Sequence, residues 1–151
     1  MEVFIAGIMQ GSRDDDRIVD QQYRAILTRA LEQHVDNAIV TDPLSLDPDS
    51  VSYNPEQAKD AFLTNTAKAV NADVLIAYLP QASMGTAIEM WTAFRANVPI
   101  VVVTPLKHNW VVWVTADETF HDLESLLDEI ESGRFAEKWR PMKMRPIDES
   151  S

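Results

Sequence analysis

The sequence predicts an α/β fold: a single doubly wound, mostly parallel five-stranded sheet of the Rossmann-like or flavodoxin-like type, with helices on both faces. Two observations predict it. Short apolar segments alternate along the chain with longer segments that keep a helical period, which is the pattern of repeated strand–helix units. From Asp73 to Leu79 the apolar residues are nearly continuous, so this strand is expected to be buried on both faces at the centre of a parallel sheet.

Five apolar segments are the predicted strands: residues 3–7, 38–40, 73–79, 99–103 and 111–114. Four segments with apolar side chains at helical spacing are the predicted helices: residues 14–34, 56–71, 84–97 and 121–131. Local signals mark their ends. Asp14 to Asp16 place acids where the dipole of the first helix favours them, Pro55 begins the second helix, and Gly133 stops the last.

The rest of the chain is assigned to loops and a tail. Residues 41–55 contain Pro43, Pro48 and Pro55 among Asp and Ser residues, which predicts a loop of about 15 residues of the kind that often binds ligands. Residues 1–133 are therefore predicted to form one α/β domain. Residues 134–151, with two prolines and a polar end, are predicted to be a loosely attached C-terminal tail.

Composition excludes several classes of function. The absence of cysteine excludes a disulfide scaffold, a thiolate zinc site and a thiol nucleophile, and the three scattered histidines lack metal-ligand spacing, so we expect neither a metal nor a cofactor. Thirteen basic against 24 acidic residues give a net charge of −11, which is unsuited to nucleic acid. No apolar run is long enough for a membrane helix or a signal peptide, so we expect a cytoplasmic protein without membrane contact.

The turn after the central strand carries the chemistry-bearing residues. In a doubly wound sheet, ligands bind beyond the carboxyl ends of the strands. Ser83 is placed to cap the next helix, so that the amides of Gly85 and Thr86 face the crevice. Glu89, one turn after Gly85, leans toward the helix N-terminus and over that glycine. We predict Glu89 as the reactive carboxylate. The alternative is that Glu89 is a solvated acid without a function, but a carboxylate without a role is energetically unfavourable on a helix whose side chains are mostly apolar.

These segments resemble a known family. Residues 72–77 (ADVLIA), followed by 83–89 (SMGTAIE), and the first loop at residues 6–15 (AGIMQGSRDD) are similar to the nucleoside 2-deoxyribosyltransferase superfamily. The 2′-deoxynucleoside 5′-phosphate N-hydrolases are the branch that the chain resembles most. The resemblance runs from about residue 3 to residue 115 and gives residues 1–133 the expected character of a nucleoside-deoxyribosyltransferase-like domain.

The resemblance implies cleavage or transfer of the N-glycosidic bond of a (deoxy)nucleoside or nucleotide, with Glu89 as the nucleophile that attacks the anomeric carbon. It also implies that Ser83 holds the 5′ end of the ligand. Further implied ligand contacts come from the first loop and from a segment that reaches the partner subunit's site: Gly7, Gln10, Gly11, Ser12, Arg13 and Asn109. A homodimer or larger homo-oligomer with shared sites is implied as well.

The chain departs from the family pattern in both loops. Asn65 stands where the family usually has the Asp that assists the leaving base, and an amide cannot act as an acid. Ile8 and Gln10 replace the Ser and Arg that the hydrolase branch uses for phosphate. Arg13 is a further phosphate candidate, but pairing with Asp14 to Asp16 explains it as well.

Two other functions therefore stay open. A non-catalytic nucleotide-binding or sensing protein is favoured by Asn65. A phosphoribohydrolase of the cytokinin-activating type also follows a strand with a Pro-containing loop, Gly-Thr and Glu, although residues 80–83 (PQAS) lack the consecutive glycines of that family.

Overall fold

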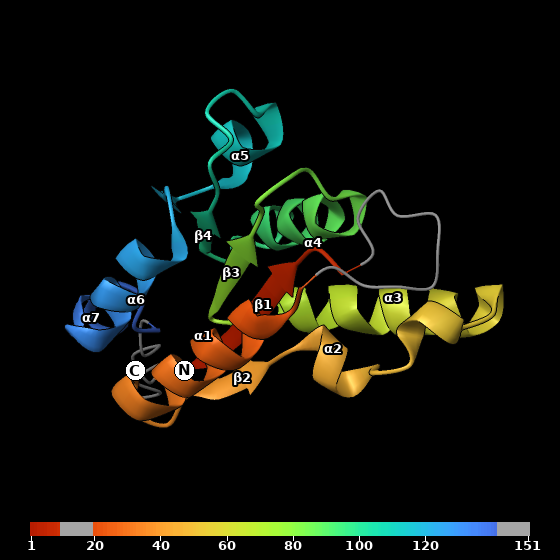
Figure 1. Ribbon diagram of the computed structural model, residues 1–151, viewed down its shortest axis with the longest axis horizontal. Helices are drawn as coiled ribbons and strands as arrows, with labels where there is room; N and C mark the ends of the chain where they lie inside the picture. The colour runs from red at the N-terminus through yellow and green to blue at the C-terminus, as the bar shows by residue number, and fades with distance from the viewer. Residues whose placement is uncertain (10–19, 142–151) are drawn as a thin grey trace, which may run out of the picture.

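A computed structural model describes residues 1–9 and 20–141. They form the predicted doubly wound α/β fold (Figure 1). All five strands of the sheet are parallel, in the spatial order β2-β1-β3-β4-β5. Their bounds are β1 Glu2–Gly7, β2 Ile39–Thr41, β3 Val74–Tyr78, β4 Ile100–Val103 and β5 Glu118–Phe120. The central position predicted for residues 73–79 is confirmed, because β3 lies third in this order.

Helices cover both faces of the sheet. Their bounds are α1 Gln22–His34, α2 Pro43–Leu46, α3 Pro55–Val70, α4 Met84–Arg95, α5 Trp110–Thr115, α6 Leu123–Glu131 and α7 Arg134–Lys138, with a 3-10 turn η1 at Ser50–Ser52. On one face, alternate strand residues such as Ile5 and Ile76 pack against α1, α6 and α7. On the other face, the intervening residues such as Phe4 and Leu75 pack against α3, α4 and α5.

The predicted fifth strand is wrong. Residues 111–114 belong to helix α5, and the fifth strand is β5, which pairs with β4. A run of valines and tryptophan favours a strand locally. The helix that forms instead is capped by the Asn109 side chain, which accepts a hydrogen bond from the amide of Val112 at 3.2 Å.

The two ends of the predicted domain also differ from the sequence prediction. Helix α1 begins at Gln22, and Asp20 and Gln21 before it are not helical, so it does not extend back to residues 14–16, which lie outside the described residues. At the other end, part of the predicted tail forms α7, and its Phe135 is buried in the core. Among the residues described, no helix combines the length and apolar character needed to cross a bilayer.

The topology places the candidate site. The chain continues from β1 to β2 on one side and later returns to β3 on the other side of β1, so the direction of winding reverses between β1 and β3. In sheets of this type the loops that leave neighbouring strands on either side of such a reversal separate and leave a crevice. Those loops are the ones that follow Gly7 and Tyr78.

Candidate active site

A pocket of about 310 Å³ lies at the carboxyl ends of β1 and β3, where the direction of winding reverses. The end of β1, the first two turns of α4, the middle of α3 and the α2–η1 loop form its walls. Its volume is at the lower limit of small-molecule sites. Six of the residues that the sequence analysis singled out line it: Gly7, Asn65, Ser83, Gly85, Thr86 and Glu89.

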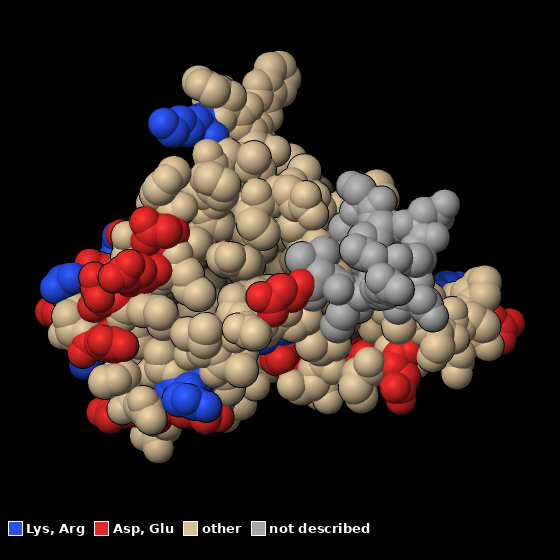
Figure 2. Space-filling view, in the orientation of Figure 1, with Lys and Arg blue, Asp and Glu red and all other residues tan. Residues whose placement is uncertain are grey.

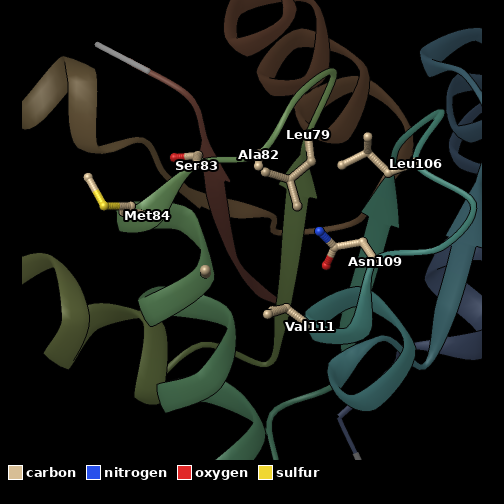
Figure 3. A pocket seen from close by; sticks show the side chains of 8 residues that line it. Leu79, Ala82, Ser83, Met84, Leu106, Asn109 and Val111 are labelled. Atoms are coloured by element: carbon tan, nitrogen blue, oxygen red, sulfur yellow. The ribbon is translucent and has the colours of Figure 1, made fainter. Parts of the chain in front are cut away.

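Of the remaining predicted site residues, four are outside the described part of the chain and one lines a neighbouring pocket. Gln10, Gly11, Ser12 and Arg13 lie outside the described residues. Asn109 lines a neighbouring pocket of about 420 Å³, which shares Ser83 and Met84 with the first. Figure 3 shows Asn109 on the wall opposite Ser83, whose hydroxyl points away from it. Within this subunit, the amide oxygen of Asn109 caps α5.

Glu89 is the charged residue among the described side chains that line the first pocket. Burial raises the pKa of its carboxyl to about 7, and the positive charge of Arg24 opposes this shift without cancelling it. A solvated acid on an exposed helical stripe would keep an ordinary pKa. Carboxyl groups shifted in this way by burial in a cleft are candidates for chemistry.

Ser83 caps α4, as the sequence predicts. Its side-chain oxygen accepts hydrogen bonds from the Thr86 hydroxyl at 3.0 Å and, more weakly, from the Thr86 amide at 3.4 Å. The Thr86 amide is therefore already engaged, whereas the hydroxyl hydrogen of Ser83 is available to a ligand. This leaves Ser83 as a donor at the rim shared by the two pockets.

A substitution at Gly85 tests whether a ligand binds against the first turn of α4. A Cβ added there meets no atom within 4 Å, so the folded chain tolerates it. We expect Gly85→Ala to raise the free energy of unfolding by up to about 1 kcal/mol, because alanine favours a helix over glycine. We also expect a ligand seated against this turn to bind at least tenfold more weakly, because the methyl group occupies its space.

The matched control for this prediction is Thr92→Ala on the same helix, which adds no atom to the pocket. Denaturant unfolding measures the stability of both variants, and calorimetric titration measures their nucleoside affinity. A Gly85→Ala protein that binds as tightly as the parent would show that the ligand does not approach this turn.

Tyr23 belongs to the core, and its hydroxyl lies directly behind Gly7 at the site. A Cβ on Gly7 would overlap that hydroxyl, so only glycine fits at the end of β1. Burial raises the pKa of Tyr23 well above its usual range; the charge of Arg24 opposes the shift, and those of Asp42 and Glu89 add to it. The hydroxyl therefore keeps its proton, and it has no hydrogen-bond partner.

Arg24 is a site-supporting residue that sequence reasoning missed. Its guanidinium donates hydrogen bonds to the carbonyls of Ile5 and Gly7, both at 3.1 Å, and to the Asp42 carboxylate at 2.8 Å. The Arg24 side chain is almost fully buried. Because Asp42 also caps α2 through the amide of Leu44, this ion pair joins two walls of the pocket. The helical period of α1 suggests a buried position, but nothing in it indicates the partner.

Asn65, the predicted replacement for the family's acid, is held by a residue that the sequence analysis did not single out. Its amide nitrogen donates to the carboxylate of Asp47 at 3.4 Å. The hydroxyl of Tyr53 donates to the other oxygen of the same carboxylate at 2.9 Å. Asp47 is 18 positions before Asn65, in the loop that was predicted to bind ligands.

No protein-family model matches the sequence, and no curated protein matches it by sequence. Solved structures do match the fold. A 2-deoxyribosyltransferase from Bacillus psychrosaccharolyticus matches with a TM-score of 0.63 at 14% identity, over 85% of this chain and 91% of the other. A conserved protein from Enterococcus faecalis matches with a TM-score of 0.61 at 17% identity, over 87% and 97%.

A CMP N-glycosidase from Clostridium botulinum also matches, with a TM-score of 0.55 at 15% identity, over 87% of this chain and 98% of the other. The chain has the fold of these proteins. At such low identity the match concerns the fold, and the chemistry of the site has to be argued from its own residues.

Proposed function

We propose that the protein cleaves or transfers the N-glycosidic bond of a (deoxy)nucleoside or nucleotide, with Glu89 as the nucleophile. The single observation that carries this proposal is a carboxyl with a pKa of about 7 in a pocket at the reversal of the sheet. Two of the matched structures are a 2-deoxyribosyltransferase and a CMP N-glycosidase, which act on this class of bond. Their fold raises the expectation but does not replace the argument from the site.

The proposed reaction has two steps. A carboxylate oxygen of Glu89 attacks the anomeric carbon, the bond from that carbon to the base nitrogen breaks, and the base leaves with the electron pair and takes a proton from water. In the second step water, or an acceptor base, attacks the same carbon. The ester bond breaks, the incoming group loses its proton to solvent, and the carboxylate is restored.

In this proposal the 5′ end of the ligand binds at the N-terminus of α4. Ser83 donates its hydroxyl hydrogen there, beside the N-terminus of α4, whose dipole favours an oxygen-rich group. The described residues that line the pocket supply no Lys or Arg, and Arg13, the phosphate candidate of the first loop, lies outside the described residues. The 5′-phosphate N-hydrolase branch therefore requires a contribution from residues outside the described ranges.

A panel of deoxynucleosides, ribonucleosides and their 5′-monophosphates tests the proposal, with free base measured by chromatography. An acceptor base is added in parallel to detect transfer. We expect at least one substrate to release or exchange its base. No release from any member of the panel, with tight binding of a nucleotide, would instead support a sensing protein, a function favoured by Asn65 in place of an acid.

We also propose that the protein is a homodimer that associates through an apolar patch on α4 and α5. The patch consists of exposed side chains on these two helices: Met84, Ile88, Trp91, Trp110, Val111, Trp113 and Val114. Trp110 is 78%, Trp113 60% and Trp91 50% exposed, so the three indoles expose on the order of 450 Å² if each carries up to about 250 Å² of surface. The four other side chains of the patch, Met84, Ile88, Val111 and Val114, extend this toward the roughly 800 Å² that one partner of a stable interface buries.

The distribution of charge supports a second copy of this chain as the partner that covers the patch. The net charge of −11 opposes self-association of most surfaces, but residues 104–116 contain one charged residue, Lys107. Figure 2 shows the region over α5 and α4 without acidic side chains, whereas these gather over the α6–α7 end of the molecule. The patch adjoins the pocket that contains Asn109, so a second copy would lie beside both pockets.

Sedimentation equilibrium tests the dimer. We expect a mass twice that of the 17.0 kDa chain for the parent protein and a monomer for Trp110→Glu, because a charge in this patch would be buried unpaired. The control is Leu63→Glu, an exposed apolar residue of α3 outside the patch, which we expect to remain dimeric. A monomeric parent protein, or a dimeric Trp110→Glu variant, would contradict the proposed interface.

A further inference from the structure

Among the described residues, two buried side-chain polar atoms have no hydrogen-bond partner: the hydroxyl of Tyr23 and the amide oxygen Oδ1 of Asn65. Both belong to the candidate active site. Tyr23 lies directly behind Gly7, and Asn65 lines the pocket itself. Buried polar groups in folded proteins are nearly always paired, so an unpaired acceptor on a residue that lines a pocket is a candidate for a hydrogen bond from a ligand.

The orientation of the Asn65 amide is determined by its surroundings. Its nitrogen donates to the carboxylate of Asp47, which can only accept hydrogen bonds when ionised. Turning the amide over would bring Oδ1 against this carboxylate, oxygen against oxygen. Tyr53 donates to the other oxygen of Asp47 and so helps to hold the carboxylate in place. Asp47 therefore fixes Asn65 with its acceptor presented away from the carboxylate.

The side of the pocket around Asn65 suits a flat ring. Tyr53, Ala61 and Phe62 line it together with Asn65, and they provide aromatic and apolar surface. Phe62 is 42% exposed, so part of its side chain is open to solvent at this wall. Glu89 and Ser83 come from α4 on the other wall, which leaves the α3 side for the base when the sugar is at Glu89.

We propose that Asn65 Oδ1, oriented by Asp47, selects nucleosides whose base presents an amino group to it, and disfavours bases that present a carbonyl oxygen at the same position. This inference rests on the proposed function and specifies its substrate class. An amino group supplies the missing donor. A carbonyl leaves Oδ1 unpaired and faces it with a second acceptor, a combination that hydrogen-bonding sites reject strongly.

Two matched substrate pairs test the proposal: deoxycytidine against deoxyuridine, and deoxyadenosine against deoxyinosine. The members of each pair have nearly the same shape. The first member carries an amino group at the position where the second carries a carbonyl oxygen. We expect the parent protein to prefer the amino member of at least one pair by tenfold or more, both in kcat/KM for base release and in affinity measured by calorimetry.

Two variants separate the roles of the residues. Asp47→Asn lets the Asn65 amide adopt either orientation, because an amide at residue 47 can donate as well as accept. We expect the amino preference to fall below threefold in Asp47→Asn and in Asn65→Leu, which removes the acceptor altogether. Asp49→Asn is the control: this exposed acid of the same loop makes no side-chain hydrogen bond to the 3-10 turn that it precedes, and its preference should equal that of the parent.

The outcomes distinguish this inference from the proposed function. Base release without any amino preference, or a preference that survives in Asp47→Asn, overturns the role of Asn65 and leaves the glycosidase proposal standing. If no nucleoside releases its base, the proposed reaction fails, and the affinities of the same pairs still decide the inference. Equal affinity for both members of each pair, or no binding of any, overturns it. Circular dichroism melting establishes that each variant is folded before it is assayed.

Discussion

Replacing Glu89 by Gln is expected to reduce base release by at least about 10³-fold while the protein still binds nucleosides. The amide preserves the shape of the side chain but cannot form a glycosyl ester through a carboxylate oxygen. Chromatographic measurement of free base, with calorimetric titration of the same substrate, separates loss of chemistry from loss of binding. A variant that retains a tenth of the parental rate would show that Glu89 is not the nucleophile.

The pH dependence of the parental rate gives a second measurement on the same residue. Because the pKa of Glu89 is about 7, the nucleophilic carboxylate is the minor form at pH 6 and the major form at pH 8. We expect kcat/KM to rise between these values with an apparent pKa near 7. A rate that is flat from pH 5.5 upward would indicate a carboxyl with an ordinary pKa, as in a solvated acid.

The same raised pKa makes Glu89 costly for stability at high pH. The folded state binds a proton at this carboxyl up to about pH 7, and the unfolded chain loses it near pH 4.5, so stability falls as pH rises between these values. We expect Glu89→Gln and the parent to unfold with similar free energies near pH 4.5. At pH 8 the variant should be more stable by up to about 3 kcal/mol. This gain also shows that lost activity does not result from unfolding.

Replacing Arg24 by Met is expected to lower the free energy of unfolding by about 3–5 kcal/mol, because it removes the cation that pairs with the Asp42 carboxylate and the donor to the carbonyls of Ile5 and Gly7 in a buried place. Methionine has a similar length and fills much of the same space, so the loss reflects charge and hydrogen bonding more than a cavity. Urea unfolding at neutral pH measures it.

Arg29 provides the matched control for this prediction. It lies on α1, like Arg24, but is exposed to solvent. We expect Arg29→Met to change the unfolding free energy by no more than about 0.5 kcal/mol, as is usual for exposed positions. Similar effects of the two substitutions would mean that the ion pair between Arg24 and Asp42 does not stabilise the fold.

The fold and the centre of the site could be predicted because their signals are local. Each strand and helix of the alternating pattern, the apolar run of β3 included, is marked by residues that are close together along the chain, and the cap at Ser83 involves a residue three positions away. The spacing of Gly85 and Glu89 on one helix follows from the same local geometry. These signals do not depend on which distant segment packs against them.

The failed prediction at residues 111–114 shows where local signals end. β-Branched and aromatic residues favour a strand, yet this segment is helix α5, and the shorter and more polar Glu118–Phe120 pairs with β4 instead. Strand preference mostly reflects packing against neighbours, so the place left at the edge of the sheet decides which segment becomes the strand.

Local patterns in the sequence were enough to predict the parallel α/β architecture and the capped turn that begins at Ser83. The residues around this turn are brought there by the packing of distant segments: Tyr23 behind Gly7, Arg24 between β1 and Asp42, and Asp47 holding Asn65. The partners of Arg24 and of Asn65 are 18 positions away along the chain, beyond the reach of helical or strand periodicity. Such pairs form because burial leaves each polar group only the partners that the packed fold brings to it.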